Sequence, residues 1–135
     1  MRLVIDSSSI ISAVIRDSSS RNIIFLSGIK FYAVQEAEDE VAKYKNEILN
    51  KAGISEEEYN RIIKDLFKKF KIINKEVIQT RLKEAEGIIG KIDIADVPFI
   101  AAALALKCGI WSDDKHFQKQ DKIRIWKTKD LAKLL

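Results

Sequence analysis

Residues 92–114 read IDIADVPFIAAALALKCGIWSDD and combine a helix with the strand that follows it. Nearly every side chain from 99 to 106 is apolar, which is typical of a helix buried against a sheet. Pro98 falls in the first turn, where proline is tolerated, and Gly109 is expected to end the helix. Residues 110–112 then indicate a strand. A buried helix that leads directly into a strand is the repeating unit of an α/β fold.

The rest of the chain alternates in the same way between short apolar runs and amphipathic segments. The apolar runs predict strands over residues 2–5, 31–34, 71–73, 110–112 and 123–126. The amphipathic segments predict helices after Ser7–Ser9 and Ser18–Ser20, over about 36–51, 55–69 and 76–89, and from Thr128. Ser55 and Glu58 have the spacing of a capping box. The alternation predicts a three-layer α/β/α sandwich with a central, mainly parallel sheet of about five strands.

The composition is that of a single globular domain, residues 1–135. Hydrophobic residues make up 47% and charged residues 33%, a balance that excludes an intrinsically disordered chain. No apolar run is long enough to cross a membrane, and a strand pattern begins directly after Met1, which leaves no room for a signal peptide. The one cysteine, Cys108, is expected to be a small buried side chain without a disulfide partner. These features predict a cytoplasmic protein.

Acidic residues follow the predicted strands, or lie in the predicted helices, at four places. They are Asp6, Glu40, the pair Asp93 and Asp96, and the pair Asp113 and Asp114. The carboxyl ends of parallel strands meet at the edge where such sheets bind ligands. Carboxylates gathered there would repel one another unless a cation lay between them, and a divalent metal is the natural candidate. The net charge of +4 suits a polyanionic substrate but is a weak indication on its own.

Each of these acids also has a purely structural interpretation. Asp6 and Asp93 would serve equally as helix N-caps, and Asp96 would suit the first turn of a helix because of the helix dipole. Glu40 lies among other acids of one amphipathic helix, most of which must be solvated. The helical acid therefore stays open between Glu40 and its neighbours, among them Asp39.

Two positions near these acids have narrower expectations. Side chains of adjacent residues point in different directions, so only one of Asp113 and Asp114 is expected to enter a site. Ser8 is placed to donate a hydrogen bond to Asp6. His116 is the only histidine, and it is expected to be a loop or surface residue rather than a ligand or general base.

Together the motifs resemble the PIN domain, a family of small metal-dependent ribonucleases that includes toxins of prokaryotic toxin–antitoxin pairs. The likeness covers nearly the whole chain, and its four motifs occur in the order found in the family. They are VIDSS at 4–8, Glu40 followed by an aliphatic residue, DIADVPFIA at 93–101 and WSDDKHF at 111–117. The resemblance implies a PIN-like α/β/α sandwich.

By position, the resemblance implies a set of catalytic, metal-binding carboxylates: Asp6, Glu40, Asp96 and Asp114. It implies an auxiliary acid at Asp93, a supporting hydroxyl at Ser8, and at Ser112 a hydroxyl that orients the last aspartate. The implied cofactor is Mg²⁺ or Mn²⁺, which prefer carboxylate oxygens. The implied activity is hydrolysis of RNA phosphodiester bonds by an endoribonuclease, with single-stranded or looped RNA as the expected target.

The resemblance also implies partners and leaves alternatives open. A separate antitoxin protein and a second copy of the chain, in a homodimer, are the expected protein partners, and no membrane is expected. The main alternative is a PIN-like module that binds RNA or protein without cutting. A phosphotransfer enzyme of the haloacid-dehalogenase type would need Asp where the chain has Ser8, and a receiver domain would need an aspartate near residues 72–74.

Overall fold

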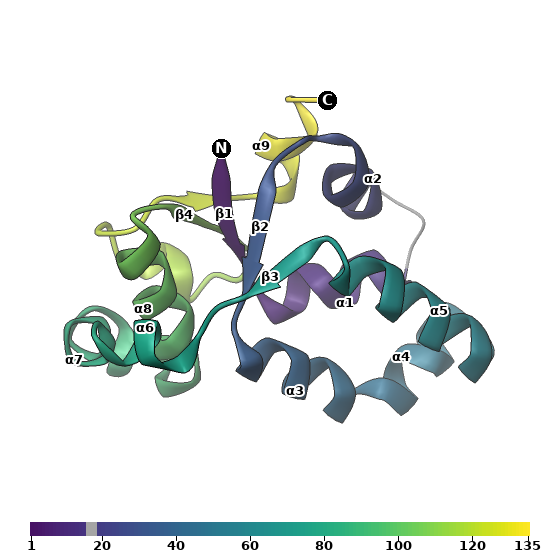
Figure 1. Ribbon diagram of the computed structural model, residues 1–135, viewed down its shortest axis with the longest axis horizontal. Coiled ribbons are helices and arrows are strands. Elements are labelled where there is room, and N and C mark those ends of the chain that lie inside the picture. Colours follow the sequence, from purple (N-terminus) through teal and green to yellow (C-terminus); the bar gives the residue numbers. More distant parts are fainter. Residues whose placement is uncertain (16–18) are drawn as a thin grey trace.

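The centre of the computed structural model, which describes residues 1–15 and 19–135, is a parallel β-sheet (Figure 1). Within the described residues its five strands are β1 (Arg2–Ile5), β2 (Lys30–Ala33), β3 (Phe70–Ile72), β4 (Gly109–Trp111) and β5 (Ile125–Trp126). The strand order is β3-β2-β1-β4-β5, and each neighbouring pair is parallel. β1 lies in the middle because Leu3, Val4 and Ile5 are apolar and can be buried on both faces.

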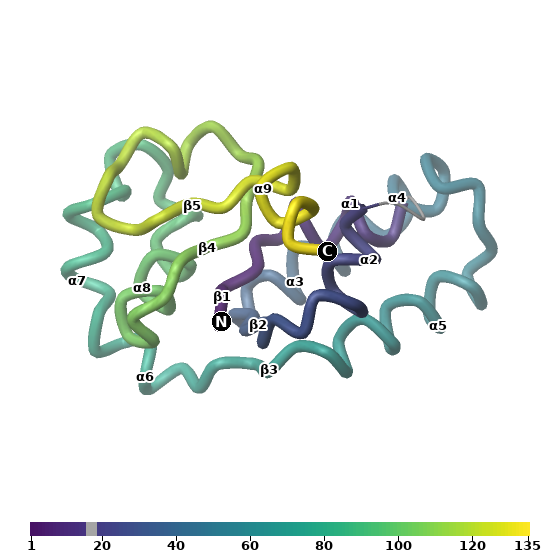
Figure 2. Tube along the Cα trace, turned by 90° about the horizontal axis from the view of Figure 1, so that it is seen from above, coloured from purple at the N-terminus to yellow at the C-terminus, as the bar shows by residue number. Residues whose placement is uncertain are grey.

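Helices cover both faces of the sheet, which confirms the predicted α/β/α sandwich. One group, at the left of Figure 1, consists of α6 (Lys75–Gln79), α7 (Leu82–Ala85) and α8 (Val97–Leu106). The opposite group consists of α1 (Ser7–Ile15), α2 (Ser19–Leu26), α3 (Gln35–Lys43), α4 (Lys45–Ala52) and α5 (Glu56–Phe67). The last helix, α9 (Thr128–Ala132), packs against α2. Figure 2 shows the two groups on opposite sides of the strands. None of the helices in the described residues is both long and apolar enough to span a membrane.

Helix α8 is the buried helix that the sequence predicts, although its end differs from the expectation. Phe99 and the residues 100–103 are buried, and the helix contacts β1 and β4. The helix ends at Lys107, which takes the left-handed conformation with φ of 53°. Gly109 instead opens β4, where a Cβ atom would lie 2.7 Å from the carbonyl oxygen of Arg124. The glycine is therefore needed for the close approach of two chain segments, and it does not stop the helix.

Two helices predicted as continuous are interrupted. The segment 36–51 divides at Tyr44 into α3 and α4, and the segment 76–89 divides into α6, α7 and a π-helical turn over Glu86–Gly90. At the second break, the hydroxyl of Thr80 donates to the carbonyl of Val77 at 2.6 Å. Such a side-chain bond competes with continuation of the helix.

The remaining differences concern the ends of elements. β5 begins at Ile125, two residues later than predicted, and α5 ends at Phe67. Thr128 is the first helical residue of α9, whose N-cap is Lys127. Cys108 is half-buried, so the expectation of full burial is wrong. Only half of the predicted capping box is present: the Ser55 hydroxyl accepts the Glu58 backbone N–H at 3.1 Å, whereas the Glu58 carboxylate lies 3.4 Å from that hydroxyl and not at the Ser55 backbone N–H. Ser18, predicted within a capping cluster, lies outside the described residues.

Candidate active site

Four carboxylates from distant parts of the sequence line one pocket beside the carboxyl ends of β1 and β4. Asp6 follows β1, and Asp114 lies in the loop after β4. Asp96 ends a 3₁₀ turn that leads into α8, and Glu40 belongs to α3. The pocket is lined by Asp6, Ser7, Ser8, Glu40, Asp96, Phe99, Asp114 and Phe117. Its volume is about 90 Å³, and a water molecule occupies roughly 30 Å³ of liquid. The pocket therefore has room for a cation with a few waters.

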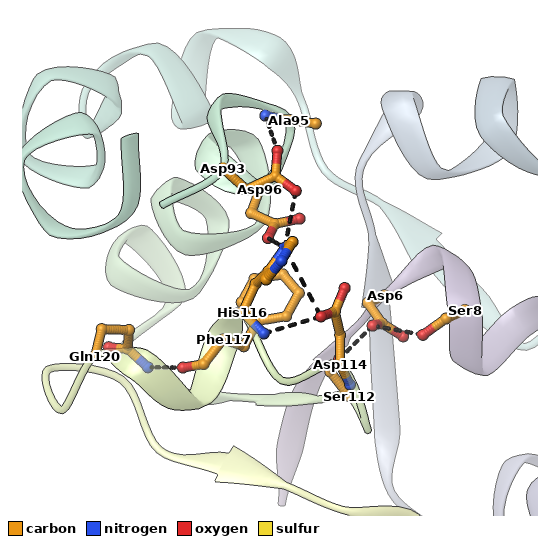
Figure 3. Close-up of polar contacts among 10 residues, drawn as sticks. All are labelled: Asp6, Ser8, Asp93, Ala95, Asp96, Ser112, Asp114, His116, Phe117 and Gln120. Carbon is orange, nitrogen blue, oxygen red and sulfur yellow. Dashed lines mark hydrogen bonds and ion pairs between the residues drawn. The ribbon is translucent and has the colours of Figure 1, made fainter. Parts of the chain in front are cut away.

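Asp6 is held by three hydrogen bonds, of which Figure 3 shows those from Ser8 and Ser112. Its Oδ1 accepts the backbone N–H of Ser9 at 2.8 Å, and its Oδ2 accepts the hydroxyl of Ser8 at 2.8 Å. The hydroxyl of Ser112 also donates to Oδ2. Asp6 is therefore both the N-cap and the candidate site residue that the sequence suggests, since the same carboxylate caps the start of α1 and lines the pocket. Burial raises the pKa of Asp6 above its ordinary value, against the opposing effect of these donors.

Ser112 connects the first and the last acidic motifs. The side chain is fully buried, and its single proton goes to Asp6. The hydroxyl oxygen in turn accepts the backbone N–H of Asp114 at 2.9 Å. Ser112 is expected to orient the last aspartate. It does so only through the backbone N–H of Asp114, because its hydroxyl donates to the carboxylate of Asp6. Ser8 lies where the sequence predicts it.

Asp96 is the acid with the most unusual environment. The residue is 8% exposed, and its Oδ2 is buried without a hydrogen-bond partner. Burial, followed by the charges of Asp93 and Asp114, raises the pKa of Asp96 to about 7. A nearby positive charge would remove this cost, since it favours the ionised carboxylate.

Asp93 and His116 extend the acidic group beyond the pocket. Asp93 caps the 3₁₀ turn Ile94–Asp96, because its Oδ1 accepts the backbone N–H of Ala95 at 3.0 Å. Its Oδ2 lies 3.0 Å from Nδ1 of His116. That nitrogen is also 3.9 Å from Oδ2 of Asp96. His116 is in a loop and partly exposed, as expected, but its ring lies among the acids, which the sequence analysis missed.

The structure separates Asp113 from Asp114. Asp114 lines the pocket, and its Oδ1 accepts the backbone N–H of His116 at 2.9 Å. Asp113 points away and accepts both the backbone N–H of Thr128, at 2.8 Å, and its hydroxyl, at 2.6 Å. Only one of the adjacent pair lines the pocket, as predicted.

In α3, Glu40 lines the pocket, whereas the exposed Asp39 lies within hydrogen-bond distance of Gln35, at 3.3 Å. The geometry therefore favours Glu40 over this neighbour as the helical acid.

The residues of the pocket fit a divalent cation. Four carboxylates supply hard oxygen donors, which Mg²⁺ and Mn²⁺ prefer. Two buried side-chain polar atoms in the described part of the chain have no hydrogen-bond partner, and both belong to pocket residues: Oδ2 of Asp96 and Oγ of Ser7. Buried polar atoms are normally paired, so these two are available to a cation or to its waters. The roles of the individual acids as ligands stay a prediction.

Two aromatic residues of the pocket were not among the sequence-derived site residues. Phe99 and Phe117 pack edge to face, with ring centroids 6.1 Å apart, and both are buried. Phe117 closes the motif at 111–117, which was a signal for it, whereas Phe99 could be recognised only as a core residue of α8. The pair forms the apolar part of the pocket wall.

Comparison with known proteins identifies a family and a similar solved structure. The family model of the PIN domain matches residues 4–135. Among solved structures, the chain is similar to a chain of VapBC2 from Rickettsia felis bound to a DNA fragment from their promoter, with 14% sequence identity and a TM-score of 0.64. The likeness covers 94% of this chain and 98% of that chain, and at this identity it concerns the fold. No curated protein matches the chain.

Proposed function

Since the chain belongs to the PIN domain family, we propose that it is a divalent-metal-dependent endoribonuclease. The single observation that supports this most strongly is the meeting of Asp6, Glu40, Asp96 and Asp114 in one pocket. The proposed substrate is single-stranded or looped RNA, because its unstacked bases are accessible to a protein. The RNA backbone would then lie across the mouth of the pocket.

The carboxylates are the residues that would hold Mg²⁺ or Mn²⁺. When bound, such an ion offsets the negative charge of the scissile phosphodiester and makes an attacking water more acidic. Asp96, whose Oδ2 has no hydrogen-bond partner, and the pocket-lining Asp6 and Asp114 would supply carboxylate oxygens to the ion. Glu40 closes the site from α3.

The protein fixes these oxygens before any ligand arrives. Three donors hold Asp6, and backbone N–H groups of Ser9 and His116 hold Asp6 and Asp114 from opposite sides of the pocket. Because these donors already fix Asp6 and Asp114, the two carboxylates would need little rearrangement when the charge of the reaction develops. The buried Phe99 and Phe117 keep bulk water from one side, which strengthens the electrostatic interactions within the pocket.

The proposal is tested by cleavage of a pool of structured and single-stranded RNAs. Wild type is compared with Asp6→Asn and with the matched control Asp121→Asn, which makes the same chemical change at an exposed position. Each protein is assayed with Mn²⁺, with Mg²⁺ and with EDTA. We expect metal-dependent cleavage by wild type and the control, and none by Asp6→Asn. Equal cleavage by Asp6→Asn would refute the proposed site, and binding of RNA without cleavage under either metal would indicate a binding module.

We also propose that the chain acts as the toxin of a toxin–antitoxin pair. The support is the fold similarity to VapBC2 over nearly the full length of both chains. An antitoxin would be a separate protein, encoded by a neighbouring reading frame, that binds this chain and blocks cleavage. Co-expression of the two frames tests this directly. Stable co-purification with loss of RNA cleavage is expected, and unchanged cleavage in the presence of the neighbouring product would contradict the proposal.

A further inference from the structure

We propose that Asp93, Asp96 and His116, here called the histidine cluster, form a second cation position that takes a first-row transition ion such as Mn²⁺ in preference to Mg²⁺. The position lies beside the acidic pocket and shares Asp96 with it. The role of Asp96 in both positions rests on the proposed function. Cation binding by the histidine cluster rests only on the geometry of its three residues. The acidic motifs by themselves give no reason to expect a nitrogen ligand.

The distances within the cluster suit a bound cation. One ligand atom of each residue lies within 4.8 Å of those of the other two. Nδ1 of His116 is 3.0 Å from Oδ2 of Asp93 and 3.9 Å from Oδ2 of Asp96. Adjacent ligands of an octahedral ion, at about 2.1 Å from the metal, lie about 3.0 Å apart, and opposite ligands about 4.2 Å apart. The two separations from Nδ1 fall at and between these values, so one ion can be reached by all three residues with small side-chain shifts.

A hydrogen bond between His116 and Asp93 explains only part of the cluster. It accounts for the 3.0 Å contact, but it leaves Oδ2 of Asp96 buried and without a partner. Asp96 is 8% exposed, and the 3.9 Å distance to Nδ1 is too long for a hydrogen bond. A carboxylate oxygen so buried normally has a partner. A cation between Asp96 and His116 would supply it.

The two outer ligands are held in place by the backbone. Asp93 is fixed through its Oδ1, which accepts the N–H of Ala95, so its Oδ2 remains directed at His116 (Figure 3). His116 is fixed through its own backbone N–H, which donates to Asp114. Such support lowers the cost of ordering the ligands when an ion binds.

The chemistry of the donors sets the expected ion. The His116 side chain is 43% exposed, and none of the hydrogen bonds in the described residues involves its Nε2. The ring proton can therefore reside on Nε2, in contact with water, while Nδ1 presents its lone pair to the cluster. Imidazole nitrogen favours first-row transition ions, whereas Mg²⁺ prefers oxygen ligands only. Mn²⁺ accepts both donor types and is the probe for the test.

The test is electron spin echo spectroscopy of Mn²⁺ bound to the tag-free protein without RNA. His116 is the only histidine in the chain, so any imidazole nitrogen coupled to the ion must belong to it. We expect ¹⁴N modulation in wild type and in Asp121→Asn, and its loss in His116→Gln. The same substitution should weaken Mn²⁺ binding at this position by about tenfold or more and change Mg²⁺ binding little.

Labelling only the histidine with ¹⁵N provides a measurement that does not depend on a variant. Replacement of the ¹⁴N signal by that of ¹⁵N supports the cluster even where His116→Gln fails to fold. Absence of imidazole coupling at saturating Mn²⁺ overturns the inference, as does coupling that persists in His116→Gln. RNA cleavage measured on the same samples keeps the two proposals separate. Imidazole coupling without RNA cleavage would support the cation position and refute the nuclease. RNA cleavage without imidazole coupling would support the nuclease and refute the cation position.

Discussion

Replacing Asp96 by Asn should stabilise the metal-free protein at neutral and alkaline pH. Burial and the neighbouring charges of Asp93 and Asp114 raise the pKa of Asp96 from 3.8 to about 7. The folded state therefore holds this proton more tightly than the unfolded state does. The contribution of Asp96 to the free energy of unfolding is therefore most favourable at low pH, where the carboxyl is protonated in both states. This contribution is lost as the pH rises from about 4 to about 7. Asn carries no charge at any pH, so the variant escapes this loss.

The magnitude follows from the two pKa values. Each unit of difference between the folded and unfolded pKa values corresponds to about 1.36 kcal/mol. The ionised Asp96 therefore destabilises the folded state by up to about 4 kcal/mol above pH 7. Between about pH 4.5 and pH 8, the advantage of Asp96→Asn over wild type should grow by about 3 kcal/mol. This change with pH is the quantity to compare, because the exchange of oxygen for an amide adds an offset that is the same at both pH values.

Urea unfolding in EDTA at these two pH values measures the effect, with Asp121→Asn as the exposed control. The control should differ from wild type by the same small amount at both pH values. Saturation with Mn²⁺, at about 100 times its dissociation constant, should stabilise wild type by about 2.7 kcal/mol and Asp96→Asn by clearly less. A pH-independent difference between Asp96→Asn and wild type would refute the proposed electrostatic cost, and equal stabilisation of the two by Mn²⁺ would refute the role of Asp96 as a ligand.

Three further substitutions test particular contacts. Glu40→Gln, which changes a pocket residue, should lower the rate of RNA cleavage by about tenfold or more. Asp39→Asn on the exposed face should leave that rate unchanged. Equal rates for the two variants would contradict the choice of Glu40 as the helical acid. Ser112→Ala removes a buried hydroxyl that donates to Asp6. Urea unfolding should show that the free energy of unfolding falls by about 1–3 kcal/mol. An unfolding midpoint equal to that of wild type would contradict this expectation. Gly109→Ala places a Cβ 2.7 Å from a backbone oxygen, and calorimetry should show a loss of about 1–3 kcal/mol; an unchanged melting temperature would refute the need for glycine.

The sheet and the acidic pocket could be predicted because both depend on local patterns. An apolar run such as 2–5 needs burial on both faces, and an acid such as Asp6 directly after it must then lie at the carboxyl edge of a parallel sheet. The same reasoning placed Asp114 after β4 and Asp96 at the start of α8. These local patterns bring the acids to one edge, but the choice of Glu40 in its helix, and of Asp114 over Asp113, came from the resemblance to the PIN domain.

What the sequence analysis missed depends on contacts between distant segments. His116 meets Asp93 across 23 positions of sequence, and no periodicity connects a loop with the cap of a helix. Gly109 has the ordinary signal of a helix end, but the approach of Arg124 is what requires glycine there. The division of the helix at Tyr44 has no glycine or proline to announce it. Contacts between distant segments decide the first two, and nothing in the structure explains the third.

The central claim, that the pocket between β1, β4, α3 and α8 is a divalent-cation site, is tested most directly by anomalous X-ray diffraction from crystals grown with Mn²⁺. We expect an anomalous peak within about 2.5 Å of carboxylate oxygens of Asp6 and Asp114, absent from crystals of Asp6→Asn grown under the same conditions. An empty pocket in wild-type crystals, at a concentration of Mn²⁺ that saturates the protein in solution, would contradict it.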